Sequence, residues 1–200
     1  MGKIKIYLKE VGIINEKLIP FPELEKINNY KSSSKRKESL TALSLLGEVL
    51  QEKGILSYQL SYQDQGKPFL KDLPYHFNVS HSAGIVACVV EDEEIGIDLE
   101  KITKRIIKLK KKITKIEINQ QKAAEQLTKI WVLKEAFVKY LGIGLTIPLK
   151  EIKIESSKEG YYQVNYLDQK AECKLLKYQD YYLACCVAEI ANVELEIVER

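Results

Sequence analysis

The sequence predicts a mixed α+β protein with two similar halves, each a helix packed on a sheet. Two segments, 32–53 and 114–141, carry apolar residues at helical spacing, and much of the remaining chain alternates polar and apolar residues as strands do. In addition, IVACVVE at 85–91 resembles YLACCVAE at 182–189, at an offset of 97 residues. Because this offset is close to half of the 200 residues, it indicates two related halves.

The first half is predicted to begin with a strand at 3–8 and to continue with the helix at 32–53. Three serines at 32–34 can cap the start of this helix, and Gly54 suits its end. A turn is expected at Gly66-Lys67-Pro68, and strands are expected at 57–62, 77–80, 84–91 and 94–100.

The second half is predicted to open with a lysine-rich segment at 101–115. Thr114-Lys115-Ile116-Glu117 matches a capping box, which predicts the start of a helix that runs, with or without a break, to Leu141 and ends at Gly142 and Gly144. Strands are expected at 151–155, 161–167, 171–178, 181–189 and 193–198. We therefore place the two halves at 1–101 and 102–200, together one pseudo-symmetric unit.

Composition and cysteine usage predict a cytoplasmic globular protein. A hydrophobic content of 46% is sufficient for a packed core, and no apolar run approaches the roughly 18 residues that a membrane span requires. The first residues alternate like a strand, so we expect neither export nor membrane insertion. The cysteines form no C-x-x-C pair and lie in apolar runs, so we interpret Cys88, Cys173, Cys185 and Cys186 as small buried hydrophobic residues rather than ligands or disulfide partners.

Two acids occur in an otherwise apolar strand, IGIDLE at 95–100. Since side chains alternate along a strand, Asp98 and Glu100 project to one face while Ile97 and Leu99 point to the other. Burying two like charges together requires a cation or a shifted pKa. The alternative is an exposed strand end at which both acids are solvated.

Three further motifs carry side chains that could take part in chemistry. FNVSHS at 77–82 places Ser80 and His81 at the end of a strand, and the turn at 66–68 could present its lysine to an anion. WVLKEAFVKYLGIGL at 131–145 places Glu135 and Lys139 on one helix face, with Trp131 one turn earlier. Taken singly, each motif also fits an ordinary role: a hydrogen-bonded histidine, a solvated lysine or a surface salt bridge.

In their order along the chain, these motifs resemble those of the 4'-phosphopantetheinyl transferases of the surfactin-synthetase-activating type. The matching motifs are G-K-P at 66–68, F-N-x-S-H-S at 77–82, G-I-D-x-E at 96–100 and W-x-x-K-E-A-x-x-K-x-x-G-x-G-L at 131–145. The resemblance implies two α+β halves related by a pseudo-twofold axis in a monomer. It also implies transfer of the phosphopantetheine arm of coenzyme A to a serine of an acyl- or peptidyl-carrier protein, with release of 3',5'-ADP.

The resemblance further implies a role for each site residue. Asp98, Glu100 and Glu135 are expected to bind one Mg2+, and Glu135 is also the candidate to activate the serine hydroxyl. Lys139 is expected to hold a phosphate oxygen, and it is the candidate to protonate the departing ADP. The contacts to coenzyme A are expected from Lys31, Lys67, Pro68, Ser80, His81, Asp98 and Lys139.

The chain departs from the family pattern at three places. Leu43 stands where the family usually has an arginine for the 3'-phosphate of the coenzyme, and Asn28 stands where it usually has a lysine. Lys31 remains, and the nearby cations at 35–37 are candidates to replace the arginine. A typical aromatic pair is replaced by Lys112 and Ile113.

The lysine-rich segment, KITKRIIKLKKKITK at 101–115, contains no acid. Its composition fits a nucleic-acid patch, a membrane-surface helix or a solvated face. An acidic carrier protein is the partner that best combines with the other motifs, because opposite charges speed encounter and select orientation. We therefore expect no nucleic acid and no membrane as partners. The rival function is a non-catalytic binding module that uses this segment for acidic macromolecules, and the ordered motifs disfavour a magnesium-dependent phosphohydrolase.

Overall fold

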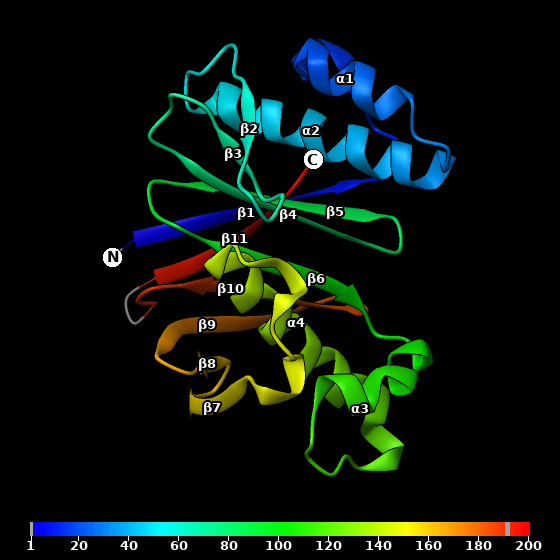
Figure 1. Ribbon diagram of the computed structural model, residues 1–200, viewed down its shortest axis with the longest axis vertical. Coiled ribbons are helices and arrows are strands. Elements are labelled where there is room, and N and C mark those ends of the chain that lie inside the picture. Colours follow the sequence, from blue (N-terminus) through cyan, green and yellow to red (C-terminus); the bar gives the residue numbers. More distant parts are fainter. Residues whose placement is uncertain (1, 191–192) are drawn as a thin grey trace. The chain divides into compact units, whose positions relative to one another are not determined.

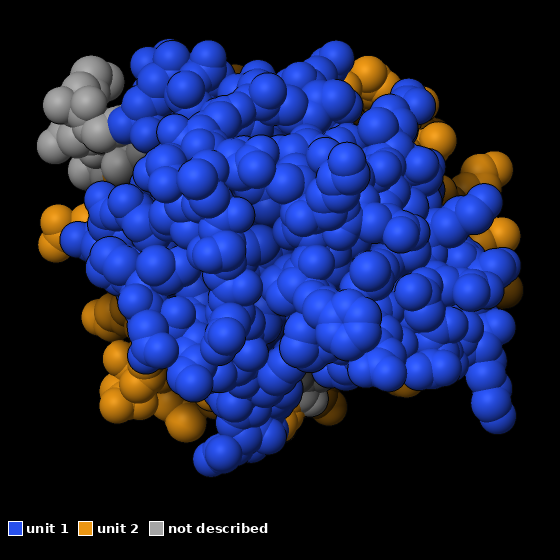
Figure 2. Space-filling model, turned by 90° about the horizontal axis from the view of Figure 1, so that it is seen from above, with its two compact units in different colours: residues 1–93, 192–200 blue, residues 94–191 orange. Residues whose placement is uncertain are grey.

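The computed structural model describes residues 2–190 and 193–200, and the chain divides into two compact units (Figure 1). Unit 1 consists of residues 1–93 and 192–200, and unit 2 consists of residues 94–191, coloured blue and orange in Figure 2. These units differ from the halves predicted at 1–101 and 102–200. The reason is strand pairing: β6 (Gly96–Lys101) pairs with β10 (Tyr181–Val187), and β11 (Val193–Glu199) pairs with β1 (Gly2–Glu10).

Unit 1 is a long helix on a four-stranded sheet. The strand order is β11-β1-β5-β4, where β4 is His76–Ser82 and β5 is Ile85–Glu91. β11 runs parallel to β1, and the other pairs are antiparallel. The helix α2 (Ser33–Glu52) packs on β5, β1 and β4 and buries its leucines between helix and sheet. Smaller elements complete the unit: η1 (Glu16–Leu18), α1 (Phe21–Asn28), β2 (Leu60–Tyr62) and β3 (Pro68–Leu70).

The start and end of α2 follow the predicted signals. The hydroxyl of Ser32 accepts a hydrogen bond from the backbone N–H of Lys35 at 3.3 Å, as an N-cap does. Gly54, just after the helix, has a φ of +82°, a conformation that glycine adopts without steric cost. The helix predicted at 32–53 is therefore confirmed, whereas the short α1 has no counterpart among the predicted elements.

Unit 2 is also a long helix on a sheet. Its five antiparallel strands have the order β6-β10-β9-β8-β7, with β7 at Lys153–Lys158, β8 at Tyr161–Tyr166 and β9 at Gln169–Tyr178. The helix α4 (Ala123–Leu141) packs on β6, β10 and β9, with Val132, Ala136 and Phe137 in the core. The other helical turns of the unit are η2 (Lys104–Leu109), α3 (Lys110–Ile113), η3 (Gln120–Lys122), η4 (Gly144–Thr146) and η5 (Leu149–Glu151).

The predicted start of the second helix at the capping box 114–117 is wrong. The Thr114 hydroxyl accepts a hydrogen bond from the N–H of Ile116, two residues later, and Thr114 itself ends α3. Such a local turn competes with helix capping. The helical turns that lead into α4 begin instead after Asn119, whose side chain accepts a hydrogen bond from the N–H of Gln121 at 2.9 Å. The predicted end at Leu141 is confirmed, and Gly142 adopts the left-handed conformation there.

The interpretation of all four cysteines as unbridged is wrong for two of them. Cys173 and Cys186 form a disulfide. They are direct partners in the antiparallel register of β9 and β10, with Cα atoms 4.2 Å apart. The spacing of cysteines in the sequence does not reveal this register. Cys88 and Cys185 are buried and take part in no disulfide among the described residues, as predicted.

The predicted α+β class, with a helix on a sheet in each half, is confirmed. The two sequence segments that resemble each other form β5 and β10, and each lies under the long helix of its own unit. Their shared alanines and cysteines are fully buried. The pseudo-twofold relation of the halves stays a prediction. Within the described residues, no helix has the length and apolar character that a membrane span requires.

Candidate active site

The packing of α4 against β6 sets the geometry of the candidate site. Gly96 makes this packing close: a Cβ atom there would lie 2.1 Å from the carbonyl oxygen of Ala136 and 2.3 Å from the nitrogen of Tyr140. Because strand side chains alternate, Asp98 and Glu100 project to the same face of β6 as Gly96. The acids of the strand therefore face the helix that carries Glu135 and Lys139.

Two buried carboxylates and one lysine meet at this contact. Asp98 is 6% exposed and Glu135 is 7% exposed. The Nζ atom of Lys139 donates a hydrogen bond to Oδ1 of Asp98 at 2.7 Å. Within the part of the chain that the structure describes, the buried Oε1 atom of Glu135 has no hydrogen-bond partner. Such an atom is costly to bury, so it marks a position where a ligand or cation would be stabilising.

The electrostatic surroundings make Glu135 a base that titrates near neutral pH. Burial, and then the negative charges of Asp98 and Glu100, raise the pKa of Glu135 to about 7, although Lys139 acts in the opposite direction. A pKa close to the working pH suits a group that accepts a proton from a hydroxyl. Glu100 thus acts electrostatically on Glu135 from the same strand as Asp98.

The carboxylates have the donor chemistry of a magnesium site. Mg2+ prefers oxygen ligands, and a positive ion here would relieve the repulsion among three acids. In residues 2–190 and 193–200, however, no three histidine, cysteine, aspartate or glutamate side chains lie close enough together to bind one metal ion. Lys139, rather than a third acid, completes the contact with Asp98. The donor set fits the ion, while the predicted three-ligand arrangement is not preformed.

A second lysine of the same motif, Lys134, was given no role by the sequence. Lys134 is only 3% exposed, and its Nζ atom donates hydrogen bonds to the carbonyl oxygens of Ile113 and Leu149, at 2.9 Å and 2.7 Å. Burial lowers the pKa of Lys134 to about 8, and the charge of Glu151 acts in the opposite direction. The only sequence signal was a lysine in an apolar stretch beside Glu135.

The predicted coenzyme contacts at 31–81 all lie in unit 1. Ser80 is buried in β4, and Nδ1 of the neighbouring His81 lies 3.5 Å from Oε2 of Glu38 on α2. Lys67 belongs to the turn between β2 and β3, Pro68 is the first residue of β3, and β3 contacts β4. Lys31 is exposed just before α2.

Leu43, the residue at the position of the family's arginine, lies in the hydrophobic core of unit 1. It is 9% exposed and packs with the other leucines of α2. The residue thus belongs to the fold of this unit. The cations at 35–37, in contrast, lie near the start of α2, where Lys35 and Lys37 are exposed and Arg36 is partly buried.

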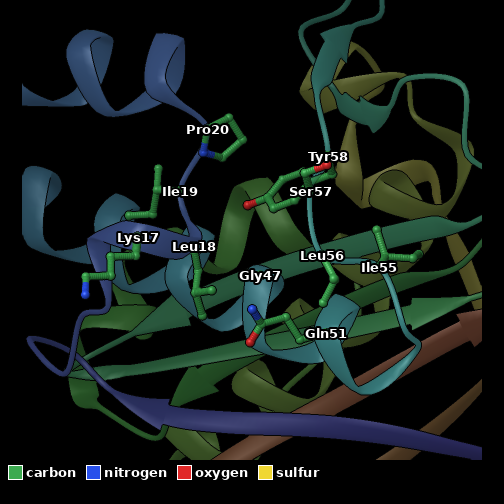
Figure 3. Close-up of a pocket in the computed structure, with 10 residues that line it drawn as sticks. All are labelled: Lys17, Leu18, Ile19, Pro20, Gly47, Gln51, Ile55, Leu56, Ser57 and Tyr58. Atoms are coloured by element: carbon green, nitrogen blue, oxygen red, sulfur yellow. The ribbon is translucent and has the colours of Figure 1, made fainter.

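Unit 1 also contains a pocket of about 100 Å³ beside η1 (Figure 3). Leu18, Gly47 and Tyr58 are among its lining residues. The chain passes close to α2 here, since a Cβ atom on Gly47 would lie 2.7 Å from Leu18. None of the predicted site residues lines this pocket.

Part of the chain matches the sequence model of a known family. The sequence model of the 4'-phosphopantetheinyl transferase superfamily matches residues 94–186, which include β6 and α4. This region of the chain is therefore similar to members of that superfamily.

Individual relatives extend the match over most of the chain. The 4'-phosphopantetheinyl transferase Sfp of Bacillus subtilis strain 168 is 29% identical over 208 residues, which cover 90% of this chain and 92% of the relative. Psf-1 of Bacillus pumilus is 27% identical over 200 residues, covering 90% and 84%. A third transferase, from Bacillus subtilis, is 34% identical over 137 residues, but the match spans only 61% of its length and 63% of this chain. The predicted resemblance to transferases of the Sfp type is confirmed.

Proposed function

We propose that this protein transfers the 4'-phosphopantetheine arm of coenzyme A to a serine of an acyl- or peptidyl-carrier protein and releases 3',5'-ADP. The main support for this proposal is that Asp98, Glu135 and Lys139 lie together between β6 and α4. These residues fall within the region that matches the superfamily model. Phosphoryl transfer needs positioned charge more than covalent help from the protein, and this cluster offers a base and a cation beside each other.

The proposed roles follow from the chemistry of each group. The serine oxygen of the carrier forms a bond to the β-phosphorus of coenzyme A, and the bond from that phosphorus to the ADP oxygen breaks. Glu135 accepts the hydroxyl proton, and Lys139 holds a phosphate oxygen and supplies a proton to the departing ADP. Asp98, Glu100 and Glu135 would hold Mg2+, which neutralises the charge of the pyrophosphate when bound.

The coenzyme-binding residues of unit 1 are a further part of the proposal. Lys67, Pro68, Ser80 and His81 are proposed to contact coenzyme A, with Lys31 and the cations at 35–37 serving its 3'-phosphate. This assignment is supported by the order of the sequence motifs and by the exposure of Lys35 and Lys37 on α2. The monomeric state implied by the resemblance and the cytoplasmic location predicted from composition also belong to this proposal.

The lysine-rich segment 101–115 is proposed to dock the carrier protein. Ile106 and Ile113 anchor η2 and α3 because they are buried against Leu127 of α4. The outer side of the segment exposes Ile107, which is 41% exposed, among several lysines. Exposed cations around an apolar side chain form a surface suited to an acidic protein partner.

Carrier binding is expected to weaken with salt more than coenzyme binding does. Between about 0.1 M and 1 M salt the Debye length falls from about 10 Å to about 3 Å, so exposed lysines lose most of their attraction. Kd values for carrier and coenzyme, measured by calorimetry across a salt series, test this. Replacing Lys108 and Lys111 by glutamine should flatten the salt dependence of carrier binding, whereas Lys170→Gln, on an exposed lysine of β9, should not. Carrier affinity that stays constant with salt would argue against this docking surface.

The transfer itself is tested by intact-mass measurement. The protein is incubated with coenzyme A, Mg2+ and an apo carrier protein of the acyl or the peptidyl kind. The carrier is expected to gain the mass of the phosphopantetheine arm. If carriers bind through the segment 101–115 but none gains mass, the rival function, a binding module for acidic macromolecules, is supported instead.

A further inference from the structure

The ammonium group of Lys134 joins three segments of unit 2. It extends from α4 and donates hydrogen bonds to Ile113 O, at the end of α3, and to Leu149 O, at the start of η5. A buried ammonium group is costly unless hydrogen bonds compensate for the lost water. Here two backbone carbonyls provide that compensation, and the charge strengthens both bonds.

This arrangement links the lysine-rich segment to the catalytic helix. Ile113 is the last residue of α3, which belongs to the segment proposed to dock the carrier. Consecutive residues of a helix point about 100° apart. Lys134 can therefore hold α3 while Glu135, its neighbour in the chain, faces Asp98 on β6.

An exposed ion pair connects the same regions and serves as a comparison. Lys115 and Glu151 form a salt bridge of 2.7 Å, but their side chains are 64% and 41% exposed. Exposed pairs contribute little because water and salt screen them. The buried lysine is thus the stronger of the two connections between the end of the lysine-rich segment and η5.

We propose that Lys134 is a positioning residue, which holds the lysine-rich segment in the orientation that the carrier protein requires. This inference rests on the proposed function. Lys134 touches neither the coenzyme nor the reacting atoms in this assignment. Its loss should therefore weaken productive binding of the carrier and leave the use of coenzyme A largely unchanged.

The kinetic test compares Lys134→Met with Glu151→Gln. Methionine keeps the apolar length of the side chain but cannot donate a hydrogen bond. Glu151→Gln, in contrast, removes the charge of the exposed ion pair and leaves both hydrogen bonds of Lys134 in place. We expect Lys134→Met to raise KM for the carrier about tenfold or more, because the variant loses both hydrogen bonds and the loss of one charge-assisted hydrogen bond already corresponds to about tenfold. We expect kcat and KM for coenzyme A to stay near the wild-type values, and Glu151→Gln to resemble the wild type. An unchanged KM for the carrier, or an equal loss toward both substrates, would overturn the proposal.

Hydrogen exchange separates this inference from the proposed function. Without any substrate, the amides of 104–113 should exchange faster in Lys134→Met than in the wild type, and not in Glu151→Gln. If the wild type shows no transfer, the proposed function fails while the exchange data still decide whether Lys134 holds the segment. Equal exchange in Lys134→Met and wild type would overturn the positioning role. Should Lys134→Met fail to fold, Lys134→Gln, which can still donate to one carbonyl, should show a smaller change in the same direction.

Discussion

Glu135→Gln is expected to abolish transfer and to stabilise the free protein above pH 7. The glutamine keeps the size of the side chain but cannot accept the serine proton, so the rate should fall by a factor of about 100 to 10,000. Intact-mass kinetics on an apo carrier measure this loss. The matched control is Glu125→Gln, the same change at a position of α4 whose side chain is 38% exposed. If Glu135→Gln transfers the arm as fast as Glu125→Gln does, Glu135 is not the base of the reaction.

The stability effect has a definite sign. The folded protein raises the pKa of Glu135 from 4.5 to about 7, so between these values the folded state binds more protons than the unfolded chain. The stability associated with the protonated acid is complete below about pH 4.5 and is lost as the pH rises through 7. At pH 8 the buried ionised carboxylate should lower the unfolding free energy of the wild type by about 3 kcal/mol. Glu135→Gln carries no charge at this position and should not show this loss.

Urea unfolding in the presence of a chelator, at pH 5 and pH 8, measures this effect. The free energy of unfolding of Glu135→Gln, relative to the wild type, should rise between the two pH values. Glu125→Gln should show no such rise, since Tyr182 and Lys129 lower the pKa of Glu125 instead of raising it. If the difference in unfolding free energy between Glu135→Gln and the wild type is the same at pH 5 and pH 8, the pKa of Glu135 is not raised by its surroundings.

Gly96→Ala is expected to damage both the fold of unit 2 and the site. The added Cβ atom would lie 2.1 Å and 2.3 Å from backbone atoms of α4, which no side-chain rotation can relieve. Helix and strand must therefore separate, at a cost of about 3 kcal/mol or more. Because Asp98 lies two residues further along the same face, separation also removes it from Lys139, and transfer should be lost.

The neighbouring substitution Ile97→Val is the control for Gly96→Ala. Ile97 is fully buried but points to the other face of β6, so the change should cost about 1 kcal/mol and leave transfer intact. Thermal unfolding and the transfer assay are measured on both variants. If Gly96→Ala retains wild-type stability and activity, the close contact between β6 and α4 does not define the site.

Features that depend on neighbouring residues were predictable from the sequence. The strand alternation at 95–100 correctly placed Asp98 and Glu100 on one face, and helical spacing correctly paired Glu135 with Lys139. The Ser32 cap and the end of α4 at Gly142 also depend on local chemistry.

Features that depend on distant residues were not predictable in this way. The pairing of β11 with β1 joins two strands that lie far apart in the sequence. The disulfide between Cys173 and Cys186 depends on the register of the neighbouring strands β9 and β10. The capping box at 114–117 had the right residues, but α3 already ends at Thr114, so the hydroxyl serves a local turn. Lys134 has no recognisable motif for its role, because its partners are backbone carbonyls, which every residue possesses.

The acids facing α4 are proposed to work with a divalent cation in the transfer. This role is tested by the transfer rate to one apo carrier as a function of Mg2+ concentration, for the wild type and Asp98→Ala. The wild-type rate should be negligible in a chelator and should rise to saturation with Mg2+. Asp98→Ala should remain inactive across the same range while keeping its fold. Full activity of the wild type in the chelator, or the same Mg2+ response in both proteins, would contradict this role.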